Sequence, residues 1–146
     1  MKILLAVDGS EASDAAIDEV RERPWPPDST VRVLSVTQQY MPSAPDVVLA
    51  SMPVDEIRAR LSEEAEQLTR AAGERVAAPS LTVETDVREG DPRTAILDAA
   101  DDWKADLIVV GSHGRTGIER LVMGSVAQSV VAHAHCSVEV VRRRAA

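Results

Sequence analysis

The feature that most constrains the fold of this 146-residue chain is a regular alternation of short apolar runs with longer segments of helical periodicity. Residues 3–7 and 107–110 are almost wholly apolar, which is typical of parallel strands buried on both faces. The alternation predicts the order βαβαβαβαβ, and therefore a parallel sheet with helices on both faces and right-handed crossovers. We expect an α/β fold in one domain spanning residues 1–146.

Turn and capping signals divide this pattern into elements. Ser10 and Asp91 are expected N-caps, and Pro53 and Pro92 suit first helical positions. The last helix is expected after Gly124, with Ser125 as its N-cap, and is marked by Val126, Ala127, Val130, Val131 and Ala134. Alternating apolar and polar residues predict a strand near one edge of the sheet at 81–87. The expected strands are 3–7, 31–36, 81–87, 107–110 and 138–141.

Composition and charge exclude several functional classes. The net charge of −8, from 24 acidic and 16 basic residues, argues against a nucleic-acid backbone as the main partner. No apolar stretch reaches the roughly 20 residues that cross a bilayer, and residues 1–2 lead into a strand-like run without the layout of a signal peptide. A single cysteine, Cys136, suits a reducing compartment. We expect a cytoplasmic protein with no nucleic-acid partner and no membrane partner.

The segment 111–125 reads Gly-Ser-His-Gly-Arg-Thr-Gly-Ile-Glu-Arg-Leu-Val-Met-Gly-Ser, between an apolar run and a helical pattern. Glycines placed in this way let the backbone approach a ligand and aim several N–H groups at one point. The first turn of the following helix adds unpaired N–H groups and the positive end of its dipole, with the Ser125 hydroxyl beside them. The segment therefore predicts a phosphate site in a nucleotide-binding domain.

Two better-known phosphate loops do not match this segment. A Walker loop needs a lysine after its last glycine, whereas Gly124 is followed directly by Ser125. A dinucleotide fingerprint needs Gly-x-Gly-x-x-Gly, whereas this segment begins Gly-x-x-Gly-x-x-Gly. Phosphate charge must then be met by backbone amides, by Arg115 or Arg120, or by a metal ion. If the first and fourth strands are neighbours, the loop that carries Asp8 faces the same crevice, but periodicity does not decide whether they are.

The chain resembles the universal stress protein family across essentially its whole length. The resemblance is carried by Ile-Leu-Leu-Ala-Val-Asp-Gly-Ser-Glu at 3–11, by Gly-Asp-Pro at 90–92, by Ala-Asp-Leu-Ile-Val-Val-Gly at 105–111 and by the spacing Gly111-x2-Gly114-x9-Gly124-Ser125. This spacing is similar to the motif of the family's ATP-binding branch. The resemblance implies five parallel strands in the order 3-2-1-4-5, a homodimer, and an ATP site at the carboxyl ends of strands one and four.

The resemblance also assigns roles to residues. It implies that adenine and ribose lie beside Ala6, Val7, Asp8 and Val36. The ribose and phosphates would pass along Val110, Gly111, His113, Gly114 and Arg115. The phosphates would be held by Gly124, Ser125, Val126 and Ala127. Asp8 would contact ribose or help to position Mg²⁺, an ion commonly bound through one carboxylate plus phosphates.

Two of these residues also suit purely structural roles that need no nucleotide. Asp8 is also suited to capping the backbone of a turn, and Ser125 to capping a helix whatever is bound. His113 has no acidic residue at close spacing, so we expect it to contribute backbone rather than catalysis. In the family the last strand tends to pair with its copy in a second subunit, and Ser137 and Glu139 depart from the expected apolar pattern there. These two residues are expected to weaken or alter the homodimer.

The function expected from these observations is a regulatory, ATP-binding stress-response protein. Nucleotide occupancy would bias nearby loops, such as residues 38–53, and so the choice of a protein partner that the sequence does not identify. The alternative is a slow ATP hydrolase, or an adenylate- or phosphate-transferring enzyme on the same fold. No catalytic group beyond Asp8 is evident near the phosphates. A third interpretation is a dimeric scaffold that binds no nucleotide.

Overall fold

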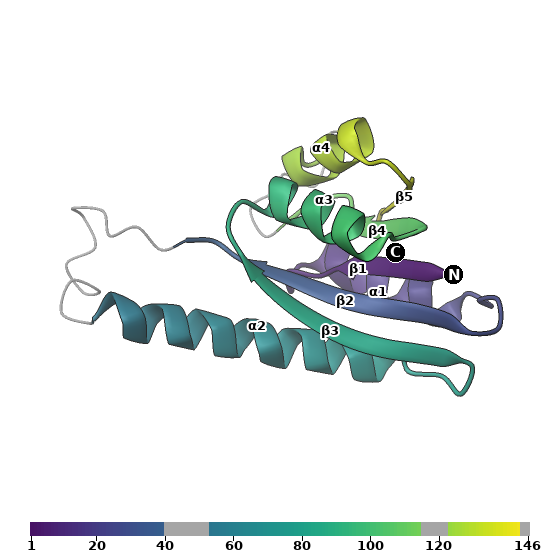
Figure 1. The fold of residues 1–146 in the computed structure, drawn as a ribbon, viewed down its shortest axis with the longest axis horizontal. Helices are drawn as coiled ribbons and strands as arrows, with labels where there is room; N and C mark the ends of the chain where they lie inside the picture. The colour runs from purple at the N-terminus through teal and green to yellow at the C-terminus, as the bar shows by residue number, and fades with distance from the viewer. Residues whose placement is uncertain (40–52, 115–122, 144–146) are drawn as a thin grey trace.

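The computed structural model describes residues 1–39, 53–114 and 123–143. Five parallel strands form one sheet in the order β3-β2-β1-β4-β5, between two layers of helices (Figure 1). The strands are β1 (Lys2–Ala6), β2 (Ser29–Thr37), β3 (Leu81–Glu89), β4 (Leu107–Gly111) and β5 (Ser137–Val141). The helices are α1 (Glu11–Glu22), α2 (Val54–Val76), α3 (Pro92–Trp103) and α4 (Ser125–His133). The predicted α/β class, element order and strand order are confirmed.

Two apolar cores lie on opposite faces of the sheet because successive side chains of a strand alternate between faces. Ile3 and Leu5 pack in the core beneath α1 and α2. Leu4, between them, packs in the core beneath α3 and α4. All three side chains are 0% exposed, and each fully buried side chain of this kind contributes about 1.5–3 kcal/mol. The apolar run at the start of the chain therefore forms the central strand.

Strand pairing brings the loops after β1 and β4 together. β1 pairs in parallel with β2 on one side and with β4 on the other, with Ile3 opposite Leu107 and Leu5 opposite Val109. The carboxyl ends of both strands therefore lie on the same side of the molecule, the left-hand side of Figure 1. Their loops leave the sheet next to each other. The adjacency that periodicity left open is thus decided by the sheet.

Helix starts agree with the predicted caps in α1 and α3 but not in the other two helices. The Ser10 hydroxyl accepts a hydrogen bond from the Ser13 N–H at 3.1 Å, as an N-cap does. Pro53 is the N-cap of α2 rather than its first residue. The prediction that Ser125 caps α4 is also wrong, because Gly124 holds the extended N-cap conformation and donates its N–H to the Ser112 carbonyl at 2.7 Å. Of the two adjacent valines that mark this helix, Val130 is 0% exposed and Val131 is 49% exposed.

Asp91 caps α3 and links the stability of the fold to pH. Its carboxylate accepts hydrogen bonds from the side chain of Arg93 and from the Arg93 N–H, both at 2.8 Å. The Arg93 guanidinium is the main cause that lowers the pKa of Asp91 from 3.8 to about 2. A carboxyl group whose pKa is lowered by folding stabilises the protein above its unfolded pKa and loses that effect as the pH falls through the folded one.

We therefore expect Asp91→Ala to have a lower melting temperature than the wild type at pH 7. The difference should shrink between about pH 4 and pH 2, where the wild-type carboxylate becomes protonated. Thermal unfolding followed by circular dichroism across this range tests the expectation, with Thr94→Ala as a control in the same helix turn that removes no carboxylate. An Asp91→Ala deficit that is equally large at pH 7 and pH 2 would contradict it.

Among the described residues, no helix is both long enough and apolar enough to cross a membrane.

Candidate functional site

The residues after β1 and β4, together with the start of α4, meet at one place. We call this place the β1–β4 site and define it as residues 6–10, 110–114 and 123–127. A Cβ atom on Gly114 would lie 3.1 Å from Oδ2 of Asp8, although the two residues are more than one hundred positions apart in the chain. The structure thus brings the carboxylate predicted from the first strand against the glycine segment after the fourth.

The Asp8 side chain takes part in the turn and also faces the glycine segment. Oδ1 of Asp8 accepts a hydrogen bond from the Ser10 N–H at 2.9 Å, and the Asp8 N–H donates to the Ser13 hydroxyl at 3.1 Å. These bonds are those of a turn residue, the simpler role expected for Asp8. Oδ2, the second carboxylate oxygen, is the one that lies beside Gly114. The two roles expected for Asp8 are therefore compatible in one side chain.

Ser112 anchors the start of the glycine segment. Its N–H donates to the Val141 carbonyl at 2.8 Å, and its own carbonyl accepts from the Gly124 N–H at 2.7 Å. Its hydroxyl lies 2.9 Å from Nδ1 of His113, and the residue is 2% exposed. Ser112 therefore ties the segment to the end of β5 and to the start of α4. It is missing from the predicted site because a lone serine among glycines carries no periodic signal.

The motif glycines have different structural reasons. A Cβ on Gly111 would lie 2.7 Å from the backbone carbon of Ala12, so this glycine lets α1 pack directly on the end of β4. A Cβ on Gly124 would lie 3.1 Å from the Ser112 carbonyl oxygen, so this glycine lets α4 begin against the segment. Gly114 is exposed, and among the described residues a Cβ on it would meet the Asp8 carboxylate alone. Of these three glycines, Gly114 is the one that faces the Asp8 carboxylate of the site, whereas the other two pack against backbone atoms.

The N-terminus of α4 differs from the other three helix starts. Because Gly124 is its N-cap, no side chain caps the first-turn N–H groups, and that turn holds no acidic residue. α1 has both a capping side chain and acidic residues in its first turn, and α3 is capped by Asp91. α2 has no side-chain cap but carries Asp55 and Glu56 in its first turn. Among the four helix starts that the structure describes, that of α4 therefore favours an anion most.

The apolar residues expected around adenine fall on both faces of the sheet. Ala6, Val36 and Val110 belong to the layer beneath α3 and α4, where Ala6 and Val36 are partly exposed and Val110 is 3% exposed. Val7 points into the opposite core, and its N–H donates to the Leu34 carbonyl at 2.8 Å. Its side chain therefore does not face the others, and its N–H is already bonded within the sheet.

The remaining expected residues are placed as follows. Ser125 is exposed and Val126 is partly buried at the start of α4, whereas Ala127 is 2% exposed and can offer little beyond its N–H. Arg115 and Arg120, two of the candidates for phosphate charge, lie outside the described residues, as do residues 40–52 of the loop expected to respond to nucleotide. The chain has two lysines, both at the opposite end of the strands: Lys2 is the first residue of β1, and Lys104 lies shortly before β4.

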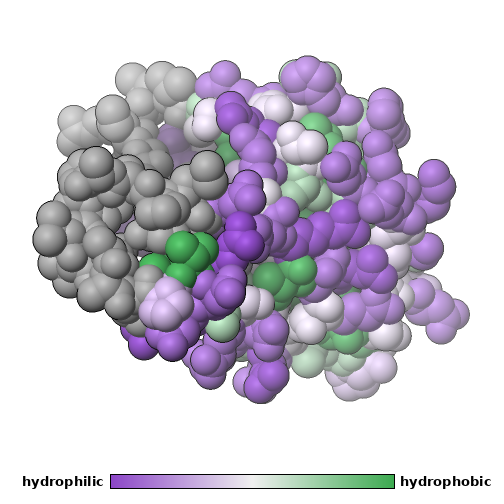
Figure 2. All heavy atoms as spheres, turned by 60° about the vertical axis from the view of Figure 1, so that its left-hand side comes forward, coloured by the Kyte–Doolittle hydropathy of each residue, from purple (hydrophilic) through white to green (hydrophobic). Residues whose placement is uncertain are grey.

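Figure 2 turns the carboxyl edge of the sheet toward the viewer. Most of the described atoms in this view belong to hydrophilic residues, and the apolar ones form small, separate patches. Within the described ranges, no group of three or more His, Cys, Asp and Glu side chains is placed to hold a metal ion. A cation at Asp8 would therefore need further ligands from a bound phosphate or from water.

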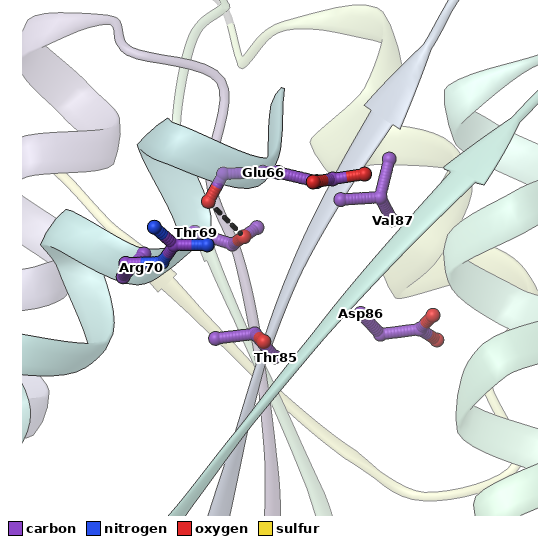
Figure 3. Close-up of a pocket in the computed structure, with 6 residues that line it drawn as sticks. All are labelled: Glu66, Thr69, Arg70, Thr85, Asp86 and Val87. Atoms are coloured by element: carbon purple, nitrogen blue, oxygen red, sulfur yellow. Dashed lines mark hydrogen bonds between the residues drawn. The ribbon is translucent and has the colours of Figure 1, made fainter. Parts of the chain in front are cut away.

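A second hollow lies between α2 and β3 (Figure 3). Its volume is about 340 Å³, and it is lined by Glu66, Thr69, Arg70, Thr85, Asp86 and Val87. The Thr69 hydroxyl bonds to the Glu66 carbonyl within the helix at 3.0 Å, and the Asp86 carboxylate bonds to Arg88 at 3.2 Å. The hollow is open and polar and contains none of the residues expected at the nucleotide site, so the β1–β4 site is the better candidate.

Comparisons with known proteins agree with this architecture. Universal stress protein YxiE of Bacillus subtilis is 30% identical over 145 residues, which are 97% of this chain and 98% of YxiE. The structure of MJ0577 of Methanocaldococcus jannaschii, solved for a structure-based assignment of biochemical function, matches with a TM-score of 0.81 at 25% identity, over 99% of this chain and 97% of that one.

Two further comparisons complete the assignment. A universal stress protein family protein of Arabidopsis thaliana with AMP bound matches with a TM-score of 0.60 at 20% identity, over 99% of this chain and 93% of that one, a likeness of fold alone. The model of the universal stress protein family matches residues 1–142. With nearly the whole chain matched and the strand order expected of that family, this chain belongs to the universal stress protein family.

Proposed function

We propose that this protein is a regulatory, ATP-binding stress-response protein that holds ATP with Mg²⁺ at the β1–β4 site. The observation that carries the proposal is the approach of the Asp8 carboxylate to Gly114, beside a helix start that lacks both a cap and acidic residues. A carboxylate suits ribose hydroxyls or a cation, and uncapped N–H groups suit phosphates. The two are adjacent, as the parts of a nucleotide are.

The expected affinity depends on several contacts together. A helix N-terminus contributes about 0.3–2 kcal/mol to binding an anion. A dissociation constant of about 10 μM requires roughly 7 kcal/mol, so the dipole of α4 alone does not suffice. Hydrogen bonds to a charged group contribute about 1.5–3 kcal/mol each, so two or three amide contacts to phosphate, with the base against Ala6 and Val36, reach this range.

Mg²⁺ fits the residues of the site as a companion of the nucleotide rather than as a resident ion. Asp8 supplies one carboxylate, and phosphate oxygens with water would complete the oxygen ligands that this ion prefers. The ion would neutralise phosphate charge, which matters in a chain whose net charge is −8 and whose lysines are both at the opposite end of the strands.

Relatives support an adenine nucleotide as the ligand. The Arabidopsis thaliana relative was solved with AMP bound, and its sheet has the same fold. We favour regulation over hydrolysis because the described part of the site offers one carboxylate and no lysine near the phosphates, which leaves no evident group to position an attacking water. The proposal includes a cytoplasmic location, in keeping with a single cysteine.

Titration calorimetry with millimolar ATP and Mg²⁺ tests the proposal. We expect saturable heat with a dissociation constant of about 1–100 μM and weaker binding when Mg²⁺ is chelated. GTP serves as the control for the base. Single-turnover incubation of the complex distinguishes the enzymatic alternative, since a regulatory protein should return ATP unchanged. The absence of heat with ATP, ADP and AMP, in protein shown to be folded, would refute the nucleotide site.

We also propose that the protein forms a homodimer through β5, which lies at one edge of the sheet. The Glu139 carboxylate, expected to disturb this edge, receives two hydrogen bonds from Arg23 at 2.6 and 2.7 Å. The pairing with Glu139 is the first cause that raises the pKa of Arg23. A counter-charge within the same chain reduces the repulsion between two copies of Glu139 across a dimer axis.

Removing that counter-charge should therefore weaken the dimer. We expect Arg23→Gln to raise the dimer dissociation constant by about fivefold at low salt, and Glu139→Gln in the same chain to restore it. Sedimentation equilibrium measures both constants, and the difference should fall as salt is added. Equal dissociation constants for wild type and Arg23→Gln would contradict the role of this pair, and a monomer at all concentrations would refute the dimer itself.

A further inference from the structure

Ser10 is the residue through which the loop after β1 holds the loop after β4. Its hydroxyl donates to the His113 carbonyl at 3.3 Å and accepts from the Ser13 N–H at 3.1 Å. Its own N–H donates to Oδ1 of Asp8 at 2.9 Å. One half-buried residue thus binds the start of α1, the Asp8 carboxylate and the glycine segment.

Helix capping does not account for all of these contacts. An N-cap side chain needs only to accept a hydrogen bond from an N–H of the first turn. A hydroxyl is also a donor, and here the donor function is directed at a carbonyl 103 positions away. A glycine at the N-cap position would begin the helix nearly as well as serine but would leave the His113 carbonyl without this donor.

The bond between Ser10 and the His113 carbonyl lies one residue from the place where the Asp8 carboxylate approaches the glycine segment. Gly114 follows His113 directly, and a Cβ on Gly114 would lie 3.1 Å from Oδ2 of the same carboxylate that Ser10 holds through Oδ1. Ser10 therefore fixes both sides of the approach, the Asp8 side through its N–H and the Gly114 side through its hydroxyl. It therefore contributes to holding the carboxylate and the backbone of the glycine segment next to each other.

We propose that Ser10 is a positioning residue that clasps the glycine segment to the β1–α1 loop and so raises the affinity of the β1–β4 site for ATP. The affinity rests on the proposed function, whereas the clasp itself does not. Ordering of a binding loop before the ligand arrives removes part of the entropy that binding would otherwise cost. Ser10 need not touch the nucleotide to have this effect.

Two substitutions distinguish the clasp, which is the bond from the Ser10 hydroxyl to the His113 carbonyl, from the N-cap bond that the same hydroxyl accepts from the Ser13 N–H. Ser10→Thr keeps a hydroxyl for both bonds, whereas Ser10→Gly removes the clasp and largely keeps the helix start. Val20→Ala, in the core at the far end of α1, is a control that lowers stability without touching the loops. The readouts are amide hydrogen exchange at Ser112 and Gly124, whose N–H groups donate to the Val141 and Ser112 carbonyls, and calorimetry with ATP and Mg²⁺.

Without nucleotide, Ser10→Gly should exchange these two amides about fivefold faster than the wild type, and it should bind ATP about fivefold more weakly, as expected for one lost hydrogen bond. Ser10→Thr should match the wild type in both measurements, and Val20→Ala should match it in affinity. Unchanged affinity in Ser10→Gly would overturn the proposal, whatever its exchange rates. Faster exchange in Ser10→Gly with no ATP binding by any variant would instead refute the proposed function and leave the clasp standing.

Discussion

Gly111→Ala is expected to destabilise the protein by about 2–3 kcal/mol, a large effect for a single methyl group. The added Cβ would lie 2.7 Å from the backbone carbon, 2.8 Å from the carbonyl oxygen and 2.9 Å from the Cβ of Ala12. Two of these atoms belong to the backbone of α1, so the clash is relieved only if the helix moves off the end of β4. Urea unfolding should show a lower midpoint, and the melting temperature should fall by roughly 5–10 °C.

Gly73→Ala is the matched control for this prediction. Gly73 lies in α2, where the added Cβ would meet a methyl group of Val83 at 3.2 Å rather than backbone. Val83 is partly exposed on an edge strand and can yield, and alanine is favoured over glycine in a helix by about 1 kcal/mol. We expect Gly73→Ala to stay within about 1 kcal/mol of the wild type. Equal stability of the two variants would show that α1 does not press on Gly111 as the structure describes.

Gly114→Val is expected to abolish the stabilisation by ATP while leaving the free protein intact. The valine side chain would enter the space beside the Asp8 carboxylate, because its Cβ would already lie 3.1 Å from Oδ2 of Asp8. It would also cover the backbone that is proposed to face the nucleotide. We expect the dissociation constant to rise at least about 100-fold, equivalent to roughly 2.8 kcal/mol. Because Gly114 is exposed, the stability of the free protein should change by less than about 0.5 kcal/mol.

Thermal shift with and without ATP and Mg²⁺ measures both quantities in one experiment. Gly73→Ala, distant from the site, should show the full wild-type shift. Gly124→Val is also expected to lose the shift, but it is a less clean variant because its Cβ would lie 3.1 Å from the Ser112 carbonyl and so disturbs the fold. A Gly114→Val protein that is stabilised by ATP as strongly as the wild type would place the nucleotide elsewhere.

Much of the fold follows from short-range patterns. Residues 3–7 and 107–110 are apolar throughout, so they predict buried parallel strands, and Ser10, Asp91 and Pro92 mark helix starts through chemistry that acts within three residues. At the start of α4, where the predicted cap is wrong, a long-range bond is responsible. The Gly124 N–H is held by the Ser112 carbonyl, twelve positions away, and this bond moves the start of α4 to Ser125.

The candidate site was predicted in its parts but not in its connections. Asp8, Gly114 and Gly124 stand out in the sequence because they follow strands or precede a helix. Ser112 and the second bond of Ser10 do not stand out, because a hydroxyl that bonds to a distant backbone group leaves no periodicity. The pairing of Glu139 with Arg23 is of the same kind, since a charge on a strand reads as a disturbance until its partner 116 positions away is known.

Local patterns in the chain are enough to predict the alternation of strands and helices, and hence a parallel sheet, because burial and hydrogen bonding within a segment depend on neighbouring residues. Periodicity does not say which loops meet, because that depends on strand order, a property of the whole sheet, and the folded sheet places β1 beside β4. The separation of 3.1 Å between the Asp8 carboxylate and the Cβ position of Gly114 exists only because β1 and β4 are neighbours. The chemistry proposed for this protein depends on that adjacency.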